Sequence, residues 1–246
     1  MSILGEIIED LQDGGIEKIA VGKHWTAVVV KLNGELRCGL SSNPNKDLAL
    51  DETLQKRLSE IEKMSAREVA GFSLMKADLL PSIGMAAINA LLPKDPDKLV
   101  KSSNAGDMIA YHGKNKKVVL VGHFPFIPEL REQVGELKVL ELKPGEGEYH
   151  ASEAPKIIPE ADVVAITSMA FVNSTMEGLL KLCSEKTFVI ILGPTSPLNA
   201  RLFTHGADMI CGCIVEEIDP VINCILDGNS FRQIKNIGVN LVSMYK

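Results

Sequence analysis

The chain has 246 residues, a formal net charge of -6 at pH 7 and an isoelectric point near 5.5. This negative charge argues against a nucleic-acid partner and against an anionic membrane surface, because both require a basic patch. With 46% hydrophobic and 24% charged residues, the composition is that of a globular protein of one large or two modest domains.

Neither a membrane span nor a secretory leader is predicted. No apolar run approaches the roughly 18 residues of a transmembrane helix, and the N-terminal stretch MSILGEIIEDLQDG is acidic and amphipathic, unlike a signal peptide. The five cysteines are odd in number and lie in apolar segments, which favours reduced thiols over a disulfide framework. We therefore expect a cytoplasmic protein.

The first half of the chain predicts a helix, a β-hairpin and then more helices. Residues 2–11 place their apolar side chains on one helical face, and residues 16–30 and 35–40 read as strands joined by an Asn33-Gly34 turn. Further helices are expected over residues 51–64, from Ser65 with Glu68 as its capping-box partner, and over residues 78–92. Small residues in the last of these, such as Gly84, predict a close backbone neighbour.

Residues 94–113 are polar and predict a linker or a segment that lines a cleft, so we place a domain boundary near residue 110. Beyond it, apolar runs alternate with segments suited to helices. Strands are expected at residues 118–121, 139–142, 163–166, 188–192 and 209–215, and helices at residues 128–134, 152–158, 174–183, 198–203 and 216–226. This order predicts an α/β fold, with a Rossmann-like parallel sheet covered by helices on both faces over residues 111–246, after a smaller α+β domain over residues 1–110.

Three loops should meet at the carboxyl edge of this sheet, where open α/β sheets usually bind ligands. They cover residues 122–126, 167–175 and 193–197. In the second loop, Ser174 and Glu177 have capping-box spacing, and in the third, Ser196 is placed to cap a helix that starts at Pro197. Backbone amides and hydroxyls at two helix starts would suit an anion or a polar small molecule, although the same residues could serve only as helix caps.

Two residues near these loops are candidates for acid-base roles. Glu141 ends the second strand of the predicted sheet and could accept a hydrogen bond from a ligand hydroxyl or amine. His123 follows the first strand and could be a ligand contact, a metal ligand, a general base or a packing residue. The loop that contains His123 reads GHFPFIPEL rather than G-x-G-x-x-G, so binding of NAD in the usual way is disfavoured.

Other common chemistries find little support in the sequence. Cys211 and Cys213 lie on one face of a strand and His205 precedes them, but the spacing is not C-x-x-C and the apolar neighbours favour a buried strand over a closed zinc site. No G-x-S-x-G elbow, Walker A loop, H-E-x-x-H motif or kinase motif set is present.

Several strings together resemble one family over nearly the whole chain. In order they are VGKHWTAVVV, LLPSIGMAAINALL, VGHFPFIPEL, ADVVAITSMAFVNSTMEGLL, GPTSPL and HGADMICG. They resemble domain-of-unknown-function family 364, labelled for heavy-metal chelation, with its usual N-terminal partner domain. The resemblance implies an N-terminal domain similar to the capping domain of enolase, a C-terminal Rossmann-like domain and a site in the cleft between them.

Carried over by position, the family pattern points to Gly122, His123, Phe124, Pro125, Thr167, Asn173, Thr175, Gly193, Pro194 and Pro197. Relatives often carry glycine after this threonine and after this asparagine, whereas the present chain has Ser168 and Ser174. These serines would narrow the pocket or add hydroxyls to it, so the identity of the ligand does not transfer.

Three functions remain as hypotheses. The first is a cytoplasmic protein that binds a small polar ligand, such as a heavy-metal chelate or its organic chelator, in the interdomain cleft. The expected ligand-binding residues are Gly122, His123, Phe124, Glu141, Thr167, Asn173, Thr175, Gly193, Pro194 and Ser196. The alternative is an enzyme, a lyase or transferase acting on a chelator or nucleotide-like compound, with His123 or Glu141 in acid-base roles. The third is an interaction module that uses its sheet edge as a homo-oligomer interface.

Overall fold

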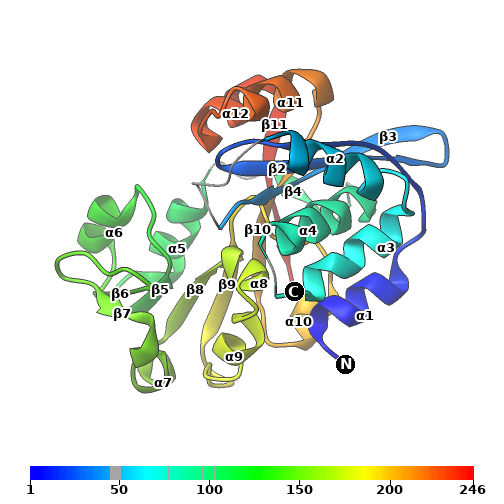
Figure 1. The fold of residues 1–246 in the computed structure, drawn as a ribbon. Coiled ribbons are helices and arrows are strands. Elements are labelled where there is room, and N and C mark those ends of the chain that lie inside the picture. Colours follow the sequence, from blue (N-terminus) through cyan, green and yellow to red (C-terminus); the bar gives the residue numbers. More distant parts are fainter. Residues whose placement is uncertain (45–50, 77, 96, 102–103) are drawn as a thin grey trace.

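The computed structural model describes residues 1–44, 51–76, 78–95, 97–101 and 104–246. Two sheets form its framework (Figure 1). The small sheet has three antiparallel strands in the order β1-β2-β3, and the large sheet has eight strands in the order β4-β11-β10-β9-β8-β5-β6-β7. The predicted α/β class, with a mostly parallel sheet flanked by helices, is confirmed. In the described part of the chain, no helix has both the length and the apolar character needed to cross a bilayer.

The small sheet follows the first helix. The elements are α1 (Ile3–Asp10), β1 (Gly15–Val21), β2 (Trp25–Leu32) and β3 (Glu35–Ser42). Our prediction of one strand over residues 16–30 is wrong, because the chain turns over residues 22–24, where Gly22, Lys23 and His24 interrupt the apolar pattern. The amide of Gly22 donates to the carbonyl of Trp25, and a Cβ atom at Gly22 would overlap the carbonyl of Ile225 in α11.

Helices then pack on one face of the small sheet. They are α2 (Glu52–Ile61), α3 (Ala66–Ala70), the 3-10 helix η1 (Gly71–Leu74) and α4 (Leu80–Leu91). The capping box of Ser65 and Glu68 is confirmed. The predicted close backbone neighbour of α4 is also confirmed. A Cβ atom at Gly84 would overlap the backbone amide of Ser73 in η1.

The second half contains the alternation that the sequence predicts. Its parallel strands are β5 (Lys117–Val121), β6 (Glu136–Glu141), β7 (Tyr149–His150), β8 (Val163–Thr167), β9 (Phe188–Leu192) and β10 (Met209–Val215). Sequence reasoning missed β7 and two further strands, β4 (Val100–Lys101) and β11 (Val239–Tyr245), which join the other edge of the sheet antiparallel to their neighbours. The passage over residues 94–113 is therefore more than a linker, because it also contains α5 (Ala105–Gly113).

Several of the remaining helices are shorter than predicted, although α6 has the predicted length of seven residues. The remaining helices are α6 (Ile127–Gln133), η2 (Ala151–Glu153), α7 (Ala154–Ile157), η3 (Ile158–Glu160), α8 (Met169–Val172), α9 (Met176–Leu180), α10 (Arg201–Thr204), α11 (Ile218–Leu226) and α12 (Phe231–Gly238).

Two predicted helix caps are wrong. Ser174 has a φ of 56°, in the left-handed region, and lies between α8 and α9 rather than capping a helix. Its expected partner Glu177 instead accepts a hydrogen bond at Oε1 from the amide of Ile3, 2.9 Å away. Ser196 does not begin a helix, because the chain stays irregular until α10 starts at Arg201. At the first place, the long-range contact of Glu177 with Ile3 replaces the local capping pattern.

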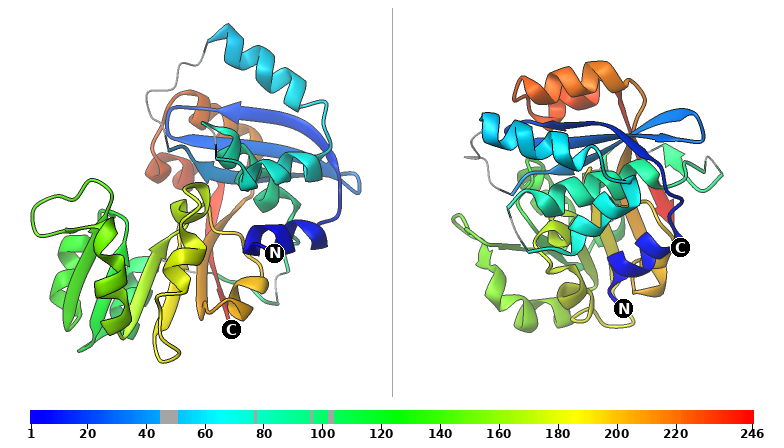
Figure 2. Two further views of the ribbon diagram at one scale, coloured as in Figure 1. Left: turned by 60° about the horizontal axis from the view of Figure 1, so that its bottom comes forward. Right: turned by 45° about the vertical axis from the view of Figure 1, so that its right-hand side comes forward.

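The helices form layers around both sheets (Figure 2). One face of the large sheet packs with α5 and α6 around Ile109, Leu120 and Leu130, and the opposite face packs with α8, α9 and the N-terminal helices. The small sheet lies between α4 on one face and α11 and α12 on the other, as both figures show. The C-terminal helices thus cover the N-terminal sheet, and the two halves of the chain share a core.

A division at residue 110 falls inside α5, which packs on the large sheet. The domain limits of 1–110 and 111–246 therefore stay a prediction, as does the likeness of the first domain to the enolase capping domain.

Ionic contacts link α1 to α10 and to His205, the residue that follows α10. Arg201 Nη2 lies 2.8 Å from Asp10 Oδ2, and His205 Nε2 lies 2.9 Å from Glu6 Oε2. The hydrogen bond from His205, supported by nearby positive charge, holds the pKa of Glu6 below its ordinary value of 4.5, although desolvation opposes this. A carboxyl whose pKa is lowered by folding stabilises the fold above its unfolded pKa and loses that contribution as the pH falls through the folded value.

We therefore expect Glu6→Gln to lower the melting temperature at neutral pH and to have no effect well below pH 4.5, where Glu6 is protonated in both states. Thermal denaturation at both pH values measures this. Glu185→Gln, at an exposed position, is the matched control. An equal loss at both pH values would contradict the assignment.

Candidate functional site

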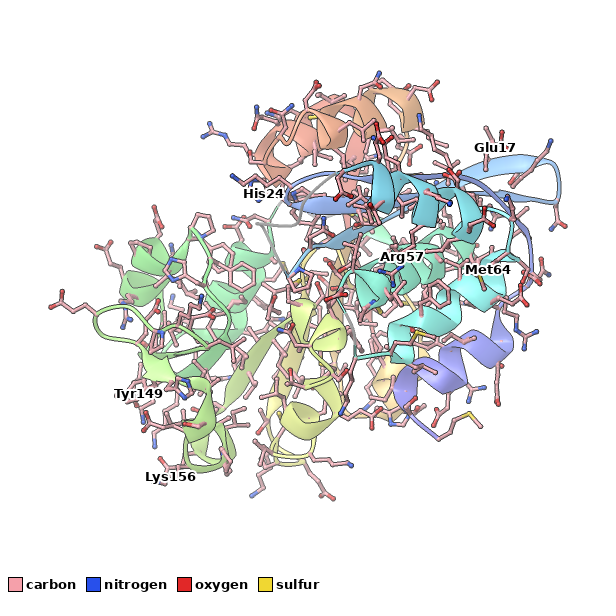
Figure 3. All side chains as sticks on the ribbon, viewed as in Figure 1. Glu17, His24, Arg57, Met64, Tyr149 and Lys156 are labelled. Carbon is pink, nitrogen blue, oxygen red and sulfur yellow. The ribbon has the colours of Figure 1, made fainter. Side chains whose placement is uncertain are left out.

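A cleft of about 1350 Å³ lies where the carboxyl ends of the large-sheet strands face the small sheet and α12. Its walls come from the loops after β5, β8 and β9, from the first turns of α5 and α6, from the β1–β2 turn and the end of β3, and from α12. Figure 3 labels His24 at the end of the small sheet that faces α5 and α6. All three loops predicted from the sequence contribute to this one cleft.

The loop after β5 places a histidine at the cleft. Gly122 has a φ of 104°, and a Cβ atom there would come within 3.0 Å of the Thr167 side chain, so glycine fits both the backbone and the space. The side chain of His123 is 65% exposed, and its Nδ1 lies 2.7 Å from Glu148 Oε1. Pairing at Nδ1 orients the ring and leaves Nε2 as the nitrogen that can meet a molecule in the cleft.

The carboxylate behind His123 is itself held in place. The side chain of Glu148 is only 6% exposed, and its Oε2 accepts a hydrogen bond from the amide of Gly145 at 2.8 Å. That backbone bond, together with His123 and the charge of Arg131, holds the pKa of Glu148 below its ordinary value, although desolvation raises it. Glu148 therefore stays ionised at neutral pH and fixes the imidazole, as in a metal-ligating or proton-transferring histidine.

Aromatic rings form walls on two sides of the cleft. Phe124 and Phe126 stack with centroids 5.1 Å apart and planes at 19°, and Phe126 packs on Gly106 of α5, where a Cβ atom would come within 3.1 Å of the ring. On the other side, the rings of Trp25 of β2 and Phe231 of α12 contact each other, with centroids 5.1 Å apart and planes at 41°. Flat apolar walls suit the faces of an organic ligand better than a bare ion.

The ends of β8 and β9 contribute the polar part of the cleft between these walls. Thr167 is half-buried and its Oγ1 accepts from the amide of Met169 at a long 3.4 Å, which leaves the hydroxyl available to a ligand. Gly193 has a φ of 123°, and a Cβ atom there would come within 2.6 Å of Ser168 Oγ. Glycine at this position therefore keeps the hydroxyl of Ser168 in the cleft lining.

Basic side chains line one side of the cleft, and acidic side chains line the opposite side. Arg232 and Lys235 come from α12, whereas Asp107 and Glu129 come from α5 and α6. This separation favours a ligand that carries a negative group toward α12 and a positive or hydrogen-bond-donating group toward α5 and α6.

The structure brings only part of the predicted set together. His123, Phe124, Thr167, Gly193 and Pro194 line the cleft, and Gly122 supports their loop.

The other four predicted residues do not line the cleft. Glu141 accepts from the amide of Leu142 at 2.7 Å, and Thr175 donates to the carbonyl of Ala170 at 3.4 Å. Asn173 is exposed, and Ser196 is 2% exposed and faces a separate small cavity. A ligand role for these four stays a prediction without support from the cleft geometry.

Sequence reasoning missed the wall that comes from the small sheet and α12. Trp25, Asn43, Phe231 and Arg232 are the clearest of these residues. Asn43 is buried and fixes the rim, since its side chain donates to the carbonyl of Gly22 at 2.8 Å and accepts from Thr26 at 2.6 Å. A signal for α12 was present, because Ser230 and Gln233 have the capping-box spacing that the structure shows.

No group of three or more His, Cys, Asp or Glu side chains is arranged to hold a metal ion within the residues that the structure describes. The thiol of Cys211 is buried, and desolvation raises its pKa. His205 is paired with Glu6 of α1 and does not line the cleft.

The sequence matches two family models. Residues 104–242 match DUF364 and residues 5–92 match DUF4213, and both are described as "Putative heavy-metal chelation". A curated relative, an uncharacterized protein of Methanocaldococcus jannaschii, is 20% identical over 237 residues, which cover 90% of this chain and 86% of the relative.

Two solved structures share the fold over nearly the whole chain. A DUF364-family protein of unknown function from Desulfitobacterium hafniense superposes with a TM-score of 0.85 at 26% identity, covering 99% of this chain and 98% of that one. Another DUF364-family protein of unknown function, from Pyrococcus horikoshii, gives a TM-score of 0.76 at 17% identity. The match covers 98% of this chain and 97% of that one. The two matched ranges follow each other along the chain with the DUF364 part second, which is the order that the resemblance implies.

Proposed function

We propose that this chain, which belongs to the DUF364 family, binds a small polar organic ligand, a chelator or its heavy-metal complex, in the cleft between its two sheets. The observation that carries the proposal is the convergence of polar and aromatic side chains from both halves of the chain on one cleft, His123 and Thr167 from one side and Trp25 and Arg232 from the other.

Two features favour a chelate over a bare ion. The described residues offer no preformed group of three metal-ligating side chains, so the chelator would supply most donor atoms and His123 Nε2 would add one. The stacked pair of Phe124 and Phe126 would contact the faces of a planar chelator, and Arg232 would pair with its carboxylate. The description of the matched families agrees with this chemistry.

Trp25 is the single tryptophan of the chain and lies in the cleft, so its fluorescence reports binding there. We expect dipicolinate or citrate, each with Zn²⁺, Ni²⁺ or Co²⁺, to change Trp25 emission saturably and to raise the melting temperature. Thr167→Val should weaken this binding by roughly 10-fold, the worth of one hydrogen bond.

Thr53→Val is the matched control for Thr167→Val, because Thr53 is an exposed threonine of α2 and lies outside the cleft lining. An unchanged Trp25 signal with every metal and chelator pair would rule out the chelate version. Equal losses in the two variants would instead show that the response does not come from this cleft.

The second candidate is an enzyme, a lyase or transferase acting on a chelator or nucleotide-like compound. The observation that favours it is the contact of His123 with the ionised Glu148, an arrangement that suits a general base. Glu141 does not line the cleft, so His123 is the stronger candidate of the two. Incubation of the purified protein with a metabolite extract tests it: turnover that His123→Gln abolishes supports the enzyme, and saturable retention without turnover supports the binder.

A further inference from the structure

Ser168, which directly follows β8, is the most buried polar residue among the described residues that line the cleft. It is only 2% exposed. Its backbone groups are both used, since its amide donates to the carbonyl of Leu192 at 2.7 Å and its carbonyl accepts from the amide of Phe171 at 3.1 Å. The sheet and α8 therefore hold this residue in place without help from its side chain.

The hydroxyl of Ser168 has no hydrogen-bond partner among the residues that the structure describes. Ser168 occupies the N-cap position of α8, yet its side chain makes no capping bond. Its Oγ lies against Gly193, where a Cβ atom would come within 2.6 Å, so glycine leaves the hydroxyl uncovered on that side. A serine hydroxyl has one donor and two acceptor sites, and all three remain for a molecule in the cleft.

A second hydroxyl adjoins that of Ser168 in the sequence and also lines the cleft. Thr167 Oγ1 accepts from the amide of Met169 at a long 3.4 Å, so its own proton can be donated to a ligand. We call Thr167, Ser168 and Gly193 the cleft floor. Solvent can satisfy both hydroxyls while the cleft is open, but a ligand that displaces this solvent has to replace the lost hydrogen bonds.

Building on the proposed binding of a chelator in this cleft, we propose that the cleft floor binds an α-hydroxycarboxylate group, with Ser168 as the residue that selects hydroxy acids. The carboxylate oxygens accept from the hydroxyls of Thr167 and Ser168, and the ligand hydroxyl donates to Ser168 Oγ. A plain carboxylate can only accept, so it would leave the acceptor sites of Ser168 buried and unpaired.

Basic side chains of α12 fit the remaining carboxylates of such a ligand. Arg232 and Lys235 are exposed and line the cleft. They attract any carboxylate, with or without a neighbouring hydroxyl, so they add affinity without discriminating between these ligands. Selection for the hydroxyl therefore comes from the cleft floor, and a hydroxy acid with several carboxylates, such as citrate, matches both parts of the cleft.

Citrate and tricarballylate are a matched pair of probes, because tricarballylate is citrate without its hydroxyl group. Both are titrated without metal, so that their different affinities for metal ions do not enter, and Trp25 fluorescence reports binding. Wild type should bind citrate about 10- to 100-fold more tightly than tricarballylate, the effect of one buried polar group left unpaired. Ser168→Ala should bring this ratio close to 1, by weakening the binding of citrate more than that of tricarballylate.

Ser59→Ala is the matched control, because Ser59 is an exposed serine of α2 outside the cleft lining, and it should keep the wild-type ratio. Thermal denaturation without ligand separates a role in binding from a structural role. Because Ser168 Oγ makes no hydrogen bond within the described structure, Ser168→Ala should melt within about 2 °C of wild type.

The proposal is overturned if wild type binds the two probes equally, if Ser168→Ala keeps the preference for citrate, or if Ser168→Ala is clearly less stable than wild type without ligand. A protein that responds to zinc dipicolinate but not to citrate would overturn the selection of hydroxy acids and leave the proposed function standing. A protein that responds to neither citrate nor any of the metal and chelator pairs would overturn both.

Discussion

Gly39→Ala should lower the free energy of unfolding by about 3 kcal/mol, a large effect for a single methyl group. Gly39 lies in β3 beneath α4, and a Cβ atom there would overlap the carbonyl of Ala86 and the amide of Ala90. Those atoms belong to the backbone of a buried helix, so no side chain can rotate away to make room. Urea denaturation of the variant measures the loss.

Gly178→Ala is the control for this variant. Gly178 lies in α9, is exposed and has no atom within 4 Å of the position that a Cβ would occupy. Alanine there should raise stability by about 0.5 to 1 kcal/mol, because it favours the helix and restricts the unfolded chain. Similar losses in the two variants would show that α4 does not approach β3 as closely as the structure has it.

Thr195→Val should cost about 1 to 3 kcal/mol of stability and should also weaken binding in the cleft. The side chain of Thr195 is fully buried, and its Oγ1 accepts from the amide of Ser42 at 2.9 Å and contacts Ser42 Oγ at 3.2 Å. Valine keeps the shape but leaves the amide of Ser42 unpaired. Because Ser42 and Pro194 both line the cleft, the lost bond loosens two of its walls.

Thermal denaturation and Trp25 titration with zinc dipicolinate, made on the same samples, measure both effects of Thr195→Val. Thr53→Val, at an exposed position of α2, is the control and should change neither. A Thr195→Val protein that is as stable as wild type would contradict the role of this hydroxyl as a link between the two halves.

The strands of the large sheet could be predicted because burial on both faces demands continuous apolar runs. The run over residues 163–166 differs from β8 (Val163–Thr167) only in its last residue. The two-residue edge strands β4 and β7 lacked that signal, as did β11, in which Asn240 and Ser243 interrupt the apolar run. The strand expected over residues 16–30 is two strands in the structure, separated at residues 22–24, where the contact with Ile225 requires glycine at position 22.

The candidate site was predictable only where topology alone brings residues together. Loops after parallel strands share an edge, so His123, Thr167 and Gly193 could be grouped from the sequence. Trp25 and Arg232 reach the same cleft through the packing of β2 and α12, which no local pattern encodes. Ser196 fits a helix cap by its spacing, yet the buried contact of Thr195 with Ser42 holds that loop out of a helix.

The cover that α11 and α12 give to the small sheet bears on the order in which the protein can fold during synthesis. Strands β1 to β3 leave the ribosome nearly 200 residues ahead of α12, so one face of their sheet stays bare until the chain is almost finished. Ala27, Val29 and Leu40, all buried on that face, would meet water or a chaperone in the interval. A fragment that stops before residue 218 would keep that exposed face permanently, so residues 5–92 and 104–242 should be produced as one polypeptide.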